Sequence, residues 1–291
     1  MKRLILAVAA LAVMLVPASS ANAELTGEWA RFSKCPTENT SVLLCVYAES
    51  TSGSFTVGNK TVPLVNPVIL KGGSIPVNIA EPIGAQTFVA PTDGVTLSKT
   101  PQPVPGGLLG VTAPSWWPQL LKDLFNETIN NGFTGITSTV ELAGPASTAV
   151  KLNPNAVASE NGVGLGLNVK IKLDNPFLGS SCYIGSNSNP VKLNLTSGTT
   201  SPPPPNTPIK GSGGFIEQLE GGSIILLKNN KLVDNSFSAP GASGCGGFLF
   251  SWAVDPLVDS ILGTPSAAGR NTAILQGNNY LGDASYVRAN K

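Results

Sequence analysis

The sequence contains no histidine among its 291 residues. Without an imidazole the chain cannot build a Ser-His-Asp triad or a Cys-His pair, and a zinc site that needs histidine is also excluded. The sequence has no G-x-S-x-G elbow either, which argues against an α/β-hydrolase. Any hydrolytic activity would therefore have to use carboxylates or other side chains that titrate away from neutral pH.

Charge is also scarce. Charged residues make up 12% of the chain, about half the usual share, and 18 basic groups stand against 17 acidic ones. After Lys2 and Arg3, Lys and Arg are scattered singly, whereas phosphate contacts need clusters of them, so we expect no nucleic-acid partner. A hydrophobic content of 42% excludes a disordered chain. The 32 glycines and 24 prolines favour a protein of strands and turns.

The longest apolar run, residues 4–16, is shorter than the roughly 20 residues that span a bilayer. Two basic residues precede this run, and residues 21–23 read Ala-Asn-Ala, a site of the type that signal peptidase cleaves. We therefore expect residues 1–23 to be a signal peptide. Residues 24–291 are then secreted to the cell exterior and contain no membrane span.

The four cysteines do not have the C-x2-C spacing of a zinc site. In an exported chain, an even number of cysteines predicts two disulfides, for which three connectivities are possible. We favour Cys35 with Cys45 and Cys182 with Cys245, because each pair is nearest in sequence. The sequence also lacks a D-x-D-x-D-G calcium loop, and no metal or cofactor is expected.

Strand patterns dominate the chain. The clearest is residues 163–173, in which apolar residues alternate with Gly, Asn and Lys, as in a strand with one buried face. Gly58-Asn59 and residues 228–231 read as the tight turns of antiparallel hairpins. The other strand-like runs are 43–48, 55–58, 61–65, 69–70, 87–89, 136–142, 191–196 and 224–228. The fold class predicted is all-β, an antiparallel β-sandwich or distorted barrel with two short helices.

The two helices are predicted at residues 118–130 and 252–262, where apolar residues recur at helical spacing. We expect each to lie against a sheet edge or to close one end of the fold. Trp116 and Trp117 precede the first helix and could form a ligand platform. We favour the simpler interpretation that they pack the start of the helix onto the sheet.

Residues 201–208 read SPPPPNTP, a polyproline-type segment. It could be a linker that splits the chain into two domains, or a surface loop within one domain. We favour the loop, because residues 24–291 are a tolerable length for a single all-β domain.

Pairs of carboxylates are the remaining candidates for catalysis, because a glycosidase needs two carboxyl groups about 5–9 Å apart. Asp255 with Asp259 on the second helix and Glu217 with Glu220 beside a strand are the possible pairs. We favour solvated surface charges for both, because neither pair is flanked by the aromatic and polar side chains of a sugar cleft.

Four stretches resemble a group of exported actinobacterial proteins that have no assigned activity. They are CPTENTSVLLCVYAES, GSFTVGNKTVPLVNPVILKGG, NPFLGSSCYIGSNSNPVKLNLTSGTTSPPPP and LVDNSFSAPGASGCGG. The resemblance covers nearly all of residues 24–291. It implies export and a Gram-positive envelope setting, and it implies no catalytic residues.

The sequence predicts a non-catalytic binding or structural protein of the bacterial cell exterior, with a cell-envelope glycan or lipid as its partner. A carboxylate-based hydrolase and a carrier of an apolar ligand are the alternatives. Two convergent buried carboxylates would favour the hydrolase, and an apolar cavity would favour the carrier. The absence of both features would favour the binding or structural protein.

Overall fold

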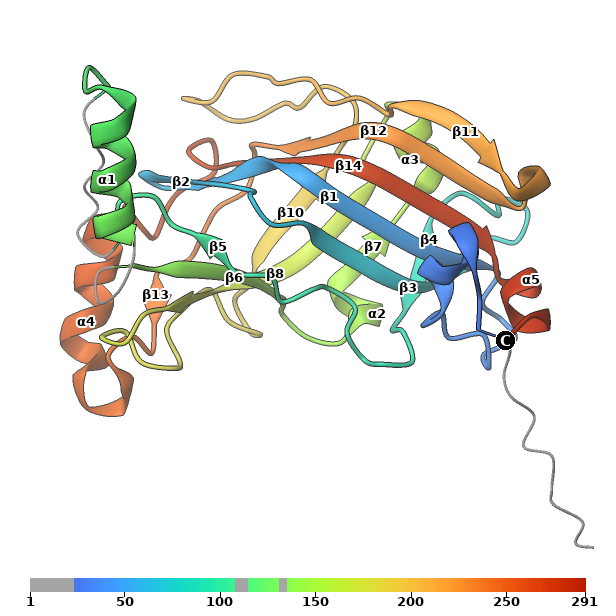
Figure 1. Ribbon diagram of the computed structural model, residues 1–291, viewed down its shortest axis with the longest axis horizontal. Helices are drawn as coiled ribbons and strands as arrows, with labels where there is room; N and C mark the ends of the chain where they lie inside the picture. Colours follow the sequence, from blue (N-terminus) through green and yellow to red (C-terminus); the bar gives the residue numbers. More distant parts are fainter. Residues whose placement is uncertain (1–23, 108–114, 131–134) are drawn as a thin grey trace, which may run out of the picture.

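The computed structural model describes residues 24–107, 115–130 and 135–291 (Figure 1). The expected signal peptide, residues 1–23, lies outside this part of the chain. None of the helices in the described part is long and apolar enough to cross a membrane.

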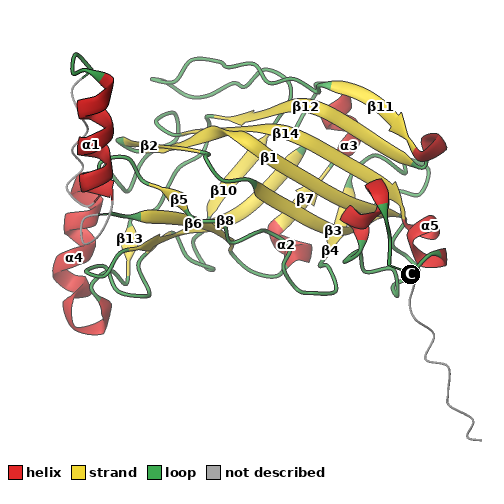
Figure 2. Cartoon of the chain, in the orientation of Figure 1, coloured by secondary structure: helices red, strands yellow, loops and turns green. Residues whose placement is uncertain are grey.

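The fold is all-β and antiparallel, as predicted, and Figure 2 shows that strands make up most of the body. The strands are β1 (Leu44–Val57), β2 (Lys60–Pro63), β3 (Val68–Pro76), β4 (Gln86–Val89), β5 (Gln102–Pro103), β6 (Thr137–Leu142), β7 (Val150–Leu152), β8 (Leu165–Asp174), β9 (Tyr183–Ile184), β10 (Val191–Leu195), β11 (Phe215–Leu219), β12 (Ile224–Asp234), β13 (Ala242–Ser243) and β14 (Thr272–Asp283). The helices are η1 (Gly27–Phe32), α1 (Gln119–Asn130), α2 (Ala146–Ala149), α3 (Pro154–Ala158), η3 (Glu220–Gly222), α4 (Gly247–Leu262) and α5 (Ala284–Ala289).

The strands form two layers. The sheet order is β11-β12-β14-β1-β3-β4-β7-β8-β6-β5, and β10 also pairs with β8. The short strands β4 and β7 connect a layer built on β1, β12 and β14 to a layer built on β6, β8 and β10. The two layers also meet where β10 ends beside β12. There Thr196, directly after β10, and Val233 of β12 form one isolated bridge with hydrogen bonds of 2.9 and 2.8 Å. The sheet does not close there, so a sandwich describes the fold better than a barrel.

The main core lies between the two layers. Strand β8 contributes its alternating apolar residues from Leu165 to Leu173, as its sequence pattern predicts. Residues of β1, β12 and β14, including Val46, Leu232 and Leu275, belong to the same buried cluster. Apolar burial of this kind, at about 25 cal/mol per Å², is the principal force that holds the two layers together.

Of the two predicted hairpin turns, only the one at Gly58-Asn59 is present. It joins β1 to β2, and Val57 pairs with Lys60 across it. Residues 228–231 are instead a bulge within β12, because the register on β14 shifts between Leu227 and Asn230. The amide of Asn230 donates to the carbonyls of Leu227 and Gly277 at 2.9 and 3.0 Å. These bonds give the two carbonyls at the bulge a donor where the strand pairing is interrupted, so β12 continues where a turn was expected.

Strand β14 was not predicted, although it pairs with β1 on one side and β12 on the other. Its centre reads Gln276-Gly277-Asn278-Asn279, a polar sequence typical of a turn. The strand is stable because both of its edges are paired, which a local pattern does not reveal.

Both predicted helices are present. Helix α1 begins at Gln119, whereas α4 begins at Gly247, earlier than the predicted start at residue 252. The two helices lie at the same end of the long axis (Figure 1). Helix α5 and the C-terminus lie at the opposite end.

The Pro-rich segment 201–208 is a loop whose flanking residues are bonded to each other. The N–H of Thr200 donates to the Ile209 carbonyl at 2.9 Å, and the Ile209 N–H donates to Thr200 Oγ1 at 3.0 Å. Within the loop, the amide of Asn206 donates to the carbonyls of Asn235 and Asn271. Strands from both sides of the loop pair in the one sheet, as β1 does with β14.

Candidate functional site

An apolar cavity lies between the two layers. The space open to the centre of a water molecule is about 90 Å³, several times what one water needs. Its wall is mostly aliphatic. The apolar residues lining it include Val57, Leu64, Leu70, Leu97, Val140, Leu165, Leu167, Ile171, Leu173, Leu193, Leu232 and Leu275.

Several polar residues of the wall are already bonded to the backbone. Gln102 Oε1 accepts the N–H groups of Val65 and Asn66, at 2.9 and 3.0 Å, and its Nε2 donates to the Asn66 carbonyl at 2.8 Å. Ser98 Oγ accepts the N–H of Ile69 at 2.9 Å. Asn230 makes the two bonds of the β12 bulge. These groups hold the wall together, so the cavity favours an apolar occupant over a polar one.

The cavity approaches the surface beside the β1–β2 hairpin. Phe55, Lys60 and Val62 line it and are half-buried, and Pro63 lines it and is exposed. Figure 1 places β2 and β5 toward the end of the molecule that carries α1 and α4. We therefore place the access to the cavity at that end.

Helix α4 covers part of this end. Leu262 is buried and lines the cavity, and Val258 and Leu262 both line a smaller adjoining cavity of about 20 Å³. The Leu262 carbonyl accepts the N–H of Asn59 at 2.7 Å. A Cβ on Gly58 would stand 2.3 Å from the same oxygen, so only glycine permits this contact between the helix and the hairpin.

The two aspartates of α4 hold its neighbouring chain in place. Asp255 accepts the N–H groups of Cys245 and Gly244 at 2.7 and 3.2 Å. Asp259 accepts the Ala242 N–H and the Thr264 hydroxyl, both at 2.6 Å. Neither lines the cavity. Both aspartates are half-buried, and N–H groups of β13 and of the segment before α4, together with the Thr264 hydroxyl, bond to their carboxylates. They therefore have a structural role at this end of the molecule.

The second carboxylate pair lies at the edge of the sheet. Glu217 on β11 pairs with Lys228 on β12, with 3.0 Å between Oε1 and Nζ. Glu220 is exposed in η3. Neither lines the cavity, and a half-exposed ion pair of this kind contributes little to stability.

Trp116 does not pack onto the sheet as predicted. It is 79% exposed, and its ring meets that of Trp117 edge-on, with 6.1 Å between centroids. The reason is the place of α1, which lies at the end of the molecule and not over a sheet face (Figure 1).

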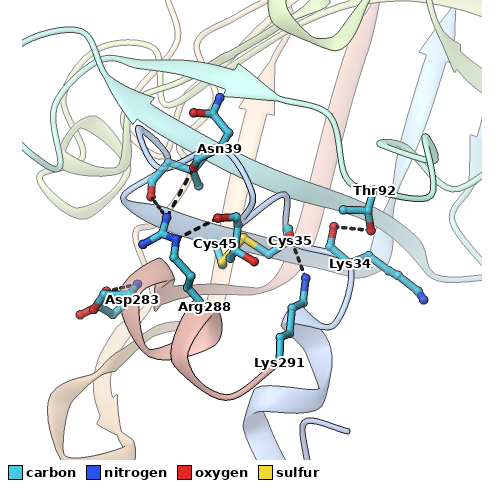
Figure 3. Close-up of a disulfide and its surroundings, with 11 residues drawn as sticks. Lys34, Cys35, Asn39, Cys45, Thr92, Asp283, Arg288 and Lys291 are labelled. Atoms are coloured by element: carbon cyan, nitrogen blue, oxygen red, sulfur yellow. Dashed lines mark hydrogen bonds between the residues drawn. A yellow bond between two sulfur atoms is a disulfide. The ribbon is translucent and has the colours of Figure 1, made fainter. Parts of the chain in front are cut away.

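Both disulfides are formed in the pairs that sequence proximity favoured, Cys35 with Cys45 and Cys182 with Cys245. Figure 3 shows the first with its surroundings. Arg288 of α5 donates to the carbonyls of Thr37 and Val42 at 2.8 and 3.2 Å, within the loop that this disulfide closes. The two disulfides indicate an oxidising compartment.

A polar hollow of about 770 Å³ lies beside the Cys35–Cys45 disulfide. Glu24, Glu38, Arg288 and Lys291 line it, and the charges of these four side chains cancel. Lys291 donates to the Cys35 carbonyl at 2.6 Å, and burial lowers the pKa of its ammonium group. Because Arg288 and Lys291 are both bonded to backbone carbonyls of residues 35–42, they hold the C-terminal segment against the loop of the first disulfide, which is a structural role.

Asp234 is the only buried acidic residue in the described part of the chain. Its carboxylate accepts the N–H groups of Asn194 and Ser236 at 2.6 and 2.8 Å, which links β12 to β10. Burial raises the pKa of this carboxyl, and the two hydrogen bonds offset that effect only in part. Asp234 does not line the cavity, and no second buried carboxylate among the described residues converges on it.

The raised pKa of Asp234 predicts a pH effect on stability. The folded state binds this proton more tightly than the unfolded state does. Protonated Asp234 therefore stabilises the folded state below the usual carboxyl pKa, about 3.9, and this stabilisation is lost as the pH rises above it. Asp234→Asn cannot ionise. The difference in the free energy of unfolding, variant minus wild type, should therefore increase as pH rises from 4 toward neutrality. A difference that is constant across a urea-denaturation series in this range would contradict the prediction.

Neither a protein-family model, nor a curated protein, nor a solved structure matches the chain. The function is therefore inferred from the geometry of the cavity and of the surface around it.

Proposed function

We propose that this protein is a non-catalytic binding protein of the bacterial cell exterior that carries an apolar ligand, such as a lipid acyl chain, between its two sheet layers. The observation that carries the proposal is the cavity, whose wall is mostly aliphatic and whose polar residues Gln102, Ser98 and Asn230 are bonded to the backbone. A glycan would need hydrogen-bonding groups that such a wall does not offer. Of the two envelope partners, glycan and lipid, the lipid is therefore the better fit.

The disulfides, the expected signal peptide at residues 1–23 and the resemblance to exported actinobacterial proteins support the assignment to the cell exterior. The carboxylate-based hydrolase has less support, because Asp255 and Asp259 are occupied by backbone N–H groups and a hydroxyl.

Burial of apolar surface sets the expected affinity pattern. Each methylene taken from water into the cavity contributes about 0.8 kcal/mol. Binding of straight-chain fatty acids should therefore tighten about fourfold per added methylene until the cavity is full, and then level off. A polar ligand of similar size should show no such series.

The proposal predicts that Val62→Trp blocks binding. Val62 lines the cavity near its access, where an indole would fill the space. Thr61→Trp is the matched control, because Thr61 is the exposed neighbour on the same strand and its hydroxyl lies 2.8 Å from that of Thr56. The measurement is the fluorescence of N-phenylnaphthylamine as it binds, and its displacement by fatty acids of increasing length.

We expect saturable binding to the wild type and to Thr61→Trp, and at least about a tenfold loss for Val62→Trp. Circular dichroism and thermal melting establish that both variants are folded. Absence of binding to the wild type, or equal binding by both variants, would contradict the proposal.

A further inference from the structure

The outward side of α4 is an exposed apolar surface. Phe248 is 98% exposed and Trp252 is 79% exposed, and Leu249, Phe250 and Leu257 are exposed as well. Ser260 is the only polar residue among the exposed residues of this helix. A soluble monomer rarely leaves such a group of large apolar side chains in contact with water.

The same end of the molecule carries α1 and the tryptophans before it (Figure 1). Trp116, Leu120, Leu121 and Leu124 are exposed there. We call these residues, together with the five exposed apolar residues of α4, the end face. Three of the four tryptophans lie at this end, whereas Trp29 is buried and stacks on Tyr286 at the other end. Tryptophan is enriched where a protein meets the interface of a bilayer.

The charges of α4 and α1 fit an uncharged partner. Asp255 and Asp259 are the only charged residues of α4, and both accept backbone N–H groups on the inner side of the helix. The outward side of α4 is therefore uncharged. Helix α1 contains Lys122, Asp123 and Glu127, so it provides no basic cluster for anionic headgroups.

The end face is also continuous with the proposed binding site. The inward residues Val258 and Leu262 of α4 line the cavities, while Phe248, Leu249 and Trp252 of the same helix face outward. A single helix thus separates the apolar interior from the apolar surface. A partner that supplies an apolar ligand would meet this helix first.

We propose that the end face docks on the surface of a lipid bilayer, with the aromatic and leucine side chains of α4 and α1 in the interface. A second protein needs hydrogen bonds or charge pairs to set its register, and the outward side of α4 offers only Ser260 for this. Insertion into a bilayer interface needs only apolar burial. Because no basic cluster is involved, docking should require no anionic lipid and should tolerate high salt.

The test is binding of residues 24–291 to phosphatidylcholine vesicles, measured by co-sedimentation and by quenching of tryptophan fluorescence with brominated acyl chains. The double variant Phe248→Ser/Trp252→Ser removes the two most exposed aromatics of α4. The matched control is Phe215→Ser/Ile216→Ser, which removes two exposed apolar residues of β11, away from the end face.

We expect the wild type and the control to bind vesicles equally, and the α4 variant to bind at least about tenfold more weakly. The quenching should report Trp116, Trp117 and Trp252 and leave the buried Trp29 unchanged. Binding that disappears at high salt would overturn the proposal. So would an absence of vesicle binding, or a wild-type dimer that the α4 variant abolishes, which would assign the end face to a second copy of the chain.

This proposal and the proposed function fail separately. The α4 variant should still bind N-phenylnaphthylamine, because Phe248 and Trp252 do not line the cavity. Val62→Trp should still bind vesicles, because Val62 is not part of the end face. Loss of both properties in either variant would show that the cavity and the end face are not distinct sites, and would overturn the docking surface as defined.

Discussion

Replacing Cys182 and Cys245 together with alanine is expected to lower the free energy of unfolding by about 4 kcal/mol. The two cysteines are 63 residues apart and fully buried. In the chain-entropy model, closing a loop of this length removes much of the conformational freedom of the unfolded state. The disulfide also ties Cys182, directly before β9, to Cys245 in the segment that leads into α4. The measurement is urea denaturation monitored by circular dichroism.

The control for this prediction is the other disulfide. Cys35 and Cys45 are only 10 residues apart, so the same model gives a loss of about 3 kcal/mol when both are replaced. The longer loop should therefore contribute more. An equal or smaller loss for the Cys182–Cys245 pair would show that loop entropy does not govern the stability of this protein.

Gly277→Ala is expected to cost more than about 3 kcal/mol. A Cβ at this position would stand 1.8 Å from the carbonyl oxygen of Glu49 on β1, far inside van der Waals contact. Strand β14 cannot move aside, because it is paired with β1 on one side and β12 on the other. A methyl group here would therefore disrupt two ladders at once. The readouts are the yield of soluble protein and the midpoint of urea denaturation.

Gly166→Ala is the comparison for this variant. Gly166 is a strand glycine in β8, and the nearest atom to an added Cβ would be the Cβ of Lys151 on the paired strand β7, at 3.2 Å, a contact that a shift of a few tenths of an ångström relieves. We expect a change of about 1 kcal/mol or less there. If Gly277→Ala were as stable as Gly166→Ala, the close approach of β1 and β14 would not be a constraint on the sequence.

The sequence by itself determined the features that depend on neighbouring residues. The strict alternation of residues 163–173 predicts β8, the Gly58-Asn59 turn predicts the β1–β2 hairpin, and helical spacing predicts α1 and α4. The pairing of the cysteines followed from their proximity in sequence. The absence of histidine excludes histidine-dependent catalysis whatever the fold, because no arrangement of the chain can supply an imidazole.

Only the tertiary structure decided the features that depend on distant contacts. The polar centre of β14 is a strand because β1 and β12 pair with both of its edges, and residues 228–231 are a bulge because β14 continues beside them. Asp255 and Asp259 have a structural role, because N–H groups of β13 and of the segment before α4 bond to their carboxylates. The periodicity of α4 predicts an apolar stripe, but only the place of the helix at the end of the sandwich decides which apolar residues close the cavity and which face solvent. Such outcomes are set by contacts between segments far apart in the chain, which local sequence patterns do not encode.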